Sequence, residues 1–79
     1  MAALVTVRYW AGARRAAGQE SEQLHAETLS DLLAQLSARP SLAPVVAASA
    51  VLVDEVAAEP ALRLYEGAVV DILPPFAGG

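Results

Sequence analysis

One apolar stripe near the middle of the chain decides which folds are open to it. Leucines recur at Leu29, Leu32, Leu33 and Leu36, which is the i, i+3, i+4, i+7 spacing of one helix face. Burying four leucine side chains contributes on the order of 6–12 kcal/mol before conformational entropy is counted. Since a chain of 79 residues has room for one small domain, we expect this stripe to be its core.

The residues around the stripe indicate where the helix begins and ends. Thr28 has a side chain suited to the N-cap, and Asp31 lies at the position from which a capping contact returns. Pro40 ends the helix, because the residue before a proline is driven out of the helical region. Ser41 is expected to cap a second, short helix that has Pro44 in its first turn.

Residues 4–10 alternate in the manner of a strand. Val5, Val7 and Tyr9 fall on one face, which we expect to meet the core, and Trp10 falls on the other. An outward Trp10 has two explanations of equal standing. Either the following loop covers part of the ring, or the ring is an anchor for a partner protein.

The segments that follow favour a hairpin. Residues 11–18 read as a turn or a short helical loop whose arginines are solvated, and residues 22–27 as a weaker second strand. Leu24 and Ala26 are expected to face inward on this strand. His25 falls on its polar face, where we interpret it as a solvated residue.

The second half of the chain predicts another hairpin and a last strand. Residues 50–53 form an apolar strand, Asp54 and Glu55 make a turn, and residues 56–57 pair back across it. We expect a loop at 60–64 that inserts Leu62 and Leu64 into the underside of the core. Residues 69–73 form the last strand.

Charge and composition exclude several classes of function. The formal net charge is −4, and no basic cluster is longer than Arg14-Arg15, so nucleic acid is not expected as a partner. Cysteine is absent and His25 is the single histidine, which leaves no disulfide framework, thiolate nucleophile or zinc site to build. The chain has neither a long apolar run nor a signal-like N-terminus. We therefore expect a soluble, cytoplasmic protein that binds no membrane and no metal.

The last strand leads into an unusual tail. Pro74 and Pro75 remove two backbone donors and stop the strand. An aromatic residue, a methyl side chain and two glycines follow, in the order Phe76, Ala77, Gly78, Gly79. Extended, this tail reaches roughly 20 Å. The taper suits a tunnel and predicts that the terminal carboxylate enters another protein's active site.

The ending Asp71-Ile72-Leu73-Pro74-Pro75-Phe76-Ala77-Gly78-Gly79 resembles the C-terminus of the MoaD/ThiS-type ubiquitin-like sulfur carriers, the family of the small subunit of molybdopterin synthase. The run from Thr28 to Leu33 is similar to the start of that family's main helix. Asp54-Glu55 departs from the Asn-Gly-like turn that is usual there. The specific motif is confined to the last nine residues, and the element order agrees over nearly the whole chain.

The resemblance implies an α+β fold of the β-grasp (ubiquitin-like) type, in which a mixed sheet packs on one main helix and a flexible Gly-Gly tail follows. Residues 1–73 would form the β-grasp domain and residues 74–79 the extended C-terminal tail.

The resemblance also implies a function. A ubiquitin-activating-like adenylyltransferase (MoeB-like) would use ATP and Mg to adenylate the Gly79 carboxylate, and a sulfur donor protein would supply the sulfur of a thiocarboxylate. The large subunit of molybdopterin synthase (MoaE-like) would then receive the tail, and the sulfur would pass to precursor Z. Gly79 is therefore the reacting residue in this interpretation. The candidate partner contacts are Pro74, Pro75, Phe76, Ala77, Gly78 and Trp10.

Three alternatives stay open. The chain is a sulfur carrier for cysteine or thiamine thiazole synthesis, a protein-conjugating modifier, or a non-covalent β-grasp module that binds through Thr6, Arg8, Trp10 and Asp71. The double proline favours the molybdopterin branch. In every case the chain binds no cofactor and is not catalytic alone, because its ionisable residues offer no nucleophile and base pair.

Overall fold

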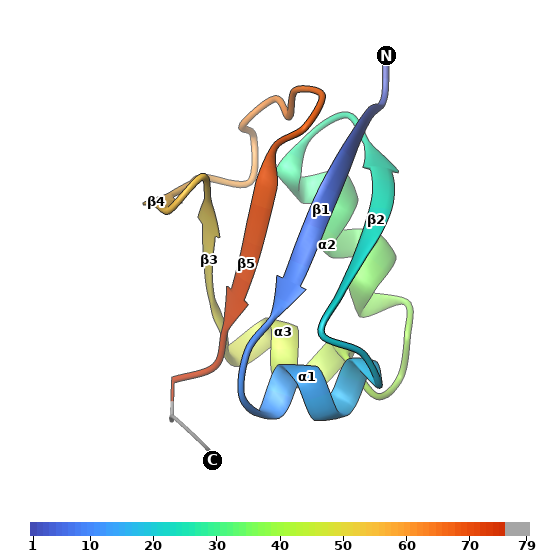
Figure 1. Cartoon of the computed structure of the whole chain (residues 1–79), viewed down its shortest axis with the longest axis vertical. Coiled ribbons are helices and arrows are strands. Elements are labelled where there is room, and N and C mark those ends of the chain that lie inside the picture. The colour runs from blue at the N-terminus through green and yellow to red at the C-terminus, as the bar shows by residue number, and fades with distance from the viewer. Residues whose placement is uncertain (76–79) are drawn as a thin grey trace.

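The chain folds into a five-stranded mixed sheet that carries one main helix on one face (Figure 1). The computed structural model describes residues 1–75. In chain order the elements are β1 (Ala3–Tyr9), α1 (Gly12–Ala17), β2 (Ser21–Ala26), α2 (Leu29–Ser37), α3 (Ala43–Ala48), β3 (Ala50–Val53), β4 (Val56–Ala57) and β5 (Val69–Leu73). The predicted order of strands and helices is confirmed.

The first and last strands lie side by side in the middle of the sheet. The strand order is β2-β1-β5-β3-β4, in which β1 and β5 are parallel and the other neighbours are antiparallel. Helix α2 crosses one face, and α1 and α3 lie together at the end of the sheet where β5 ends (Figure 1). This is the α+β β-grasp arrangement that the sequence predicted.

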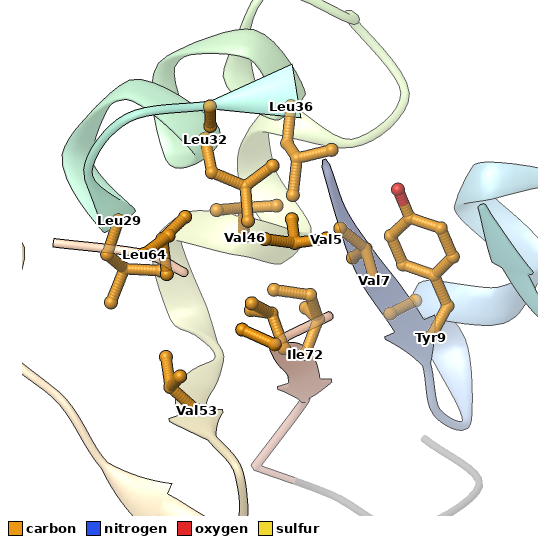
Figure 2. Close-up of a cluster of buried hydrophobic side chains, with 14 of the residues drawn as sticks. Val5, Val7, Tyr9, Leu29, Leu32, Leu36, Val46, Val53, Leu64 and Ile72 are labelled. Atoms are coloured by element: carbon orange, nitrogen blue, oxygen red, sulfur yellow. The ribbon is translucent and has the colours of Figure 1, made fainter. Parts of the chain in front are cut away.

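The leucine stripe of α2 is the centre of the core (Figure 2). Leu29, Leu32 and Leu36 are fully buried, and Leu33 packs at the margin of the cluster. The largest sheet residues in the same buried cluster are Val5, Val7, Tyr9, Val53, Val70 and Ile72. The alternation predicted for the first strand is confirmed, because its odd-numbered residues are the buried ones.

The start of α2 is capped as predicted, and the start of α3 is not. Thr28 Oγ1 accepts a hydrogen bond from the Asp31 amide at 3.1 Å, and the Asp31 carboxylate accepts one from the Thr28 amide at 3.2 Å. The assignment of Ser41 as the second cap was wrong. Leu42 occupies the N-cap position of α3 without a side-chain cap. The Ser41 hydroxyl instead donates to the carbonyl oxygen of Ala16 at 2.9 Å, which ties the turn before α3 to α1.

The turn between β3 and β4 is built from two residues in a left-handed conformation. Asp54 and Glu55 have φ angles of 48° and 67°, and a two-residue hairpin turn of type I′ needs positive φ at both central positions. Asp54 Oδ1 also accepts a hydrogen bond from the Val69 amide at 3.0 Å. The turn is therefore held against the first residue of β5.

The loop after β4 inserts one of its two leucines into the core, where the sequence predicted both. Leu64 is buried as expected, but Leu62 is 40% exposed and its predicted insertion was wrong. The backbone explains the difference. The carbonyl oxygens of Leu62 and Pro60 accept hydrogen bonds from the amides of Leu29 and Ser30 at 2.9 and 2.7 Å. These bonds satisfy donors in the first turn of α2 and fix the loop with the Leu62 side chain outside.

A polar cluster closes the core at β2. Tyr9 Oη donates to the Glu22 carboxylate at 2.5 Å, and the Arg39 guanidinium donates to the same oxygen at 2.7 Å. Burial and the bond to Glu22 raise the pKa of Tyr9 well above its usual range.

His25 is exposed on the other face, as predicted. Within residues 1–75 no helix has the length and apolar character needed to span a bilayer.

Candidate functional site

The candidate site begins where β5 leaves the sheet. Ile72 still accepts a backbone hydrogen bond from the Trp10 amide at 3.3 Å, and Leu73 still pairs with Ala50 of β3. Pro74 and Pro75 follow directly and carry no amide hydrogen with which to continue the ladder. Pro75 is already exposed. The chain thus departs from the end of a central strand, at the two prolines that predicted the stop.

The other predicted tail residues, Phe76, Ala77, Gly78 and Gly79, lie outside the described residues. Their roles as partner contacts and, for Gly79, as the reacting residue stay predictions. The division into a domain of residues 1–73 and a tail of residues 74–79 also stays a prediction, and β5 ends at Leu73.

Three side chains gather on the outer sheet face beside this exit, and we call them the Trp10 cluster. Its members are Arg8, Trp10 and Asp71. Arg8 Nε and Nη2 donate to the two carboxylate oxygens of Asp71 at 2.6 and 2.9 Å. Trp10 Nε1 donates to Oδ1 of the same carboxylate at 2.9 Å. The Arg8 guanidinium carbon also lies 5.6 Å from the centre of the indole ring, within range of a cation–π contact.

The cluster buries a charge on the solvent side of the sheet. Asp71 is only 4% exposed, whereas Trp10 keeps 41% of its surface exposed. The hydrogen bonds from Arg8 lower the pKa of Asp71, the bond from Trp10 lowers it further, and burial opposes both. The carboxylate is therefore ionised at neutral pH. It fixes the indole in place and leaves the ring available as a contact surface.

The sequence identified these three residues but not their arrangement. They were predicted to share the outer face of a non-covalent interaction module. The structure joins them by hydrogen bonds, and Asp71 is the most buried of the three. The register between the strands decides this arrangement, because Arg8 of β1 lies directly opposite Asp71 of β5. Thr6, the fourth residue of that predicted face, lies opposite Val69 instead.

Metal ligands do not gather in the described part of the chain: no group of three or more histidine or acidic residues there is arranged to hold an ion. The site therefore offers a binding surface, the Trp10 cluster, beside the end of β5.

The sequence pattern of the ThiS family matches residues 7–79. This chain belongs to the ThiS family. It is therefore a ubiquitin-like sulfur carrier with a β-grasp fold. No curated protein matches the carrier.

Solved structures share the fold over almost the whole carrier. Small archaeal modifier protein 1 from Methanosarcina acetivorans is 26% identical with a TM-score of 0.83, covering 100% of this chain and 99% of that one. Subunit 1 in the complex of subunits 1 and 2 of molybdopterin-converting factor from Helicobacter pylori is 25% identical with a TM-score of 0.79, covering 96% and 99%. The HVO 2177 protein from Haloferax volcanii is 25% identical with a TM-score of 0.80, covering 99% and 88%.

Proposed function

We propose that this carrier is the small subunit of molybdopterin synthase. The observation that carries the proposal is the ending Leu73-Pro74-Pro75-Phe76-Ala77-Gly78-Gly79, which follows directly on a central strand of a ThiS-family fold. Its similarity to subunit 1 of the Helicobacter pylori molybdopterin-converting factor, which was solved together with subunit 2, supports the same branch of the family.

The proposed chemistry takes place at the Gly79 carboxylate. One carboxylate oxygen attacks the α-phosphorus of ATP in the activating enzyme, and pyrophosphate leaves. Mg²⁺ balances the negative charge of the pyrophosphate. A persulfide sulfur of the donor protein then attacks the acyl carbon, and AMP leaves. A thiol attacks the donor's own sulfur in the resulting acyl disulfide, which releases the thiocarboxylate and leaves a disulfide. The thiocarboxylate sulfur attacks precursor Z in the large subunit to form a thioester. Water then cleaves the bond between the acyl carbon and this sulfur, so the sulfur stays on precursor Z and the carboxylate is restored.

The carrier's own residues position this reaction and catalyse none of it. Gly78 and Gly79 have no side chains, so the partner enzymes can close around the backbone. Pro74 and Pro75 stiffen the exit, and Trp10 offers a half-exposed ring beside it. Activating enzyme, sulfur donor and large subunit would all meet the carrier at this end, in the cytoplasm.

Intact mass tests the carrier step. The full chain is incubated with an activating enzyme of the family, ATP, Mg²⁺ and a sulfur donor, beside a chain that lacks Gly79. We expect the mass of the full chain to rise by the difference between one sulfur atom and one oxygen atom. The mass of the chain that lacks Gly79 should stay unchanged. No change under conditions that convert an established carrier would overturn the proposal.

A second assay tests the pathway. The thiocarboxylate form is mixed with the large synthase subunit and precursor Z, and loss of sulfur from the carrier is followed by mass. The competing candidate is a protein modifier, favoured by the 26% identity to small archaeal modifier protein 1. Covalent adducts between Gly79 and lysines of other proteins, with no transfer to precursor Z, would select that function instead.

A further inference from the structure

Exposed apolar side chains gather at the sheet edge, away from the tail. A groove of about 540 Å³ lies between β4 and the loop that follows it, and we call it the edge groove. Its largest apolar lining residues are Val56, Leu62 and Tyr65, which are 67%, 40% and 55% exposed. In residues 1–75 the other large hydrophobic side chains as exposed as these are Met1 and Trp10. The edge groove is thus a concentration of apolar surface rather than a scatter of single residues.

Carboxylates line part of the groove. Asp54 and Glu59 are lining residues, and Glu55 follows Asp54 in the exposed turn. Glu66 does not add to them, because its carboxylate accepts a hydrogen bond from the Leu4 amide at 2.9 Å. Between residues 54 and 66 the one basic side chain is Arg63, whose guanidinium lies 3.6 Å from the Glu27 carboxylate outside that segment. A ligand of this groove therefore meets an apolar floor with a negative rim.

The backbone next to the groove belongs to a sheet edge. Strand β4 is the last in the sheet order and pairs only with β3 among the described strands. Such an edge accepts an extended peptide as a further strand, with side-chain pockets supplying specificity. Val56 and Ala57 of β4 both line the groove, so a peptide along this edge would place alternate side chains in it.

The edge groove and the tail lie at opposite ends of β5. Val53, beside the groove, pairs with Val70, whereas Ala50 pairs with Leu73 at the tail end. Figure 1 shows β4 level with the upper part of β5 and the chain exit at the lower end of that strand. A partner bound at the groove would leave the tail free to react elsewhere.

We propose that the edge groove docks an extended segment of a partner protein in which apolar and basic residues alternate. Charge complementarity selects this occupant. A second copy of the chain would bring the same acidic rim and the same net charge of −4, and nucleic acid or an acidic lipid surface would be repelled. The docking site holds the carrier by its edge and is separate from the surface at which the tail is activated.

A peptide of alternating valine and lysine tests the proposal. It is titrated into the isotopically labelled full chain, and amide shifts are followed by NMR, with an alternating valine and glutamate peptide as control. We expect saturable shifts at residues 53–65 that weaken as salt is raised. Absence of saturable shifts, equal binding of the glutamate peptide, or shifts centred on Trp10 would each overturn the proposal.

Matched variants distinguish binding at the groove from an effect of the net charge of the chain. Glu59→Lys should weaken peptide binding about threefold or more, and Leu62→Ser about fivefold. Glu20→Lys changes the net charge identically at an exposed position in the loop between α1 and β2, and should leave the affinity unchanged. Equal weakening by E20K and E59K would contradict a local site.

Two controls address other interpretations. If the groove amides shift with protein concentration in the absence of peptide, the groove is a contact between copies of this chain and the proposal fails. The chain lacking Gly79 should bind the peptide as well as the full chain does. A failed peptide titration therefore leaves the proposed sulfur chemistry standing, and a failed mass assay leaves the edge groove standing.

Discussion

Replacing Asp71 by asparagine removes the buried charge of the Trp10 cluster while keeping its size. Arg8 donates two hydrogen bonds to this carboxylate and Trp10 donates one. Hydrogen bonds to charged groups contribute about 1.5–3 kcal/mol each. Arg8 is 42% exposed and regains water when the carboxylate is lost, so the contribution of one such bond, and not the sum of three, is the better guide. We expect D71N to lower the free energy of unfolding by about 2 kcal/mol.

The expected loss is large on the scale of a small domain. A change of 1 kcal/mol shifts the melting temperature of a 60–100-residue domain by about 4–8 °C, so D71N should melt about 8–16 °C lower. Urea unfolding is followed by far-UV circular dichroism and by the emission of Trp10, the single tryptophan. Arg8→Met and the double variant complete a cycle that isolates the coupling between the two charges.

The pH dependence supplies a second, independent signature. The pKa of Asp71 is lowered in the folded state from its ordinary value of 3.8, so between the two pKa values the unfolded chain binds more protons. The stabilisation is therefore complete above the ordinary value and is lost as pH falls through the lowered one. D71N should lack this component. A D71N chain with wild-type stability at neutral pH and the same acid profile would refute the reasoning.

Substitutions at three further positions test other parts of the fold by the same urea assay. Tyr9→Phe should cost about 1–2 kcal/mol, because Glu22 loses a buried donor; an unchanged midpoint would show that this bond contributes nothing. Glu55→Gly should gain about 0.5–1 kcal/mol, since glycine adopts the φ of 67° without the penalty of a side chain; a loss would contradict the strain. Thr28→Ala should cost about 1 kcal/mol by removing the acceptor for the Asp31 amide, whereas Thr28→Ser should restore most of it.

The core and the order of elements were predictable because their signals are local. The leucine spacing, the cap at Thr28 and the alternation of β1 each act over a few residues, and the structure confirms all three. The turn at Asp54 and Glu55 was found from its position between two apolar runs. Its left-handed geometry was not, because neither residue is a glycine.

The errors fall where distant segments decide. Leu62 and Leu64 look equivalent in sequence, and only the hydrogen bonds from the first turn of α2 determine which side chain enters the core. Ser41 has a suitable side chain for a cap, but α1 lies close enough to accept its hydroxyl first.

The candidate site was predicted in its residues and missed in its arrangement. Pro74 and Pro75 predicted where the chain leaves the sheet, because proline has no amide hydrogen and stops the strand. The burial of Asp71 depends on which residue of β1 lies opposite it. The register between two strands 60 residues apart cannot be read from the sequence of either strand. The edge groove was missed because it needs Leu62 to face outward, which hydrogen bonds from the first turn of α2 decide.

The parallel pairing of β1 with β5 has a consequence for synthesis of the protein. Residues 6–9 find their partners on the β5 side in residues 69–72, so the middle of the sheet cannot close while the chain is still short. Pairing over such a separation makes folding a late, non-local event. The residues after β5 are thus presented beside a finished Trp10 cluster only by chains that have completed their fold. Partners that require both features would reject nascent and misfolded copies without any separate inspection.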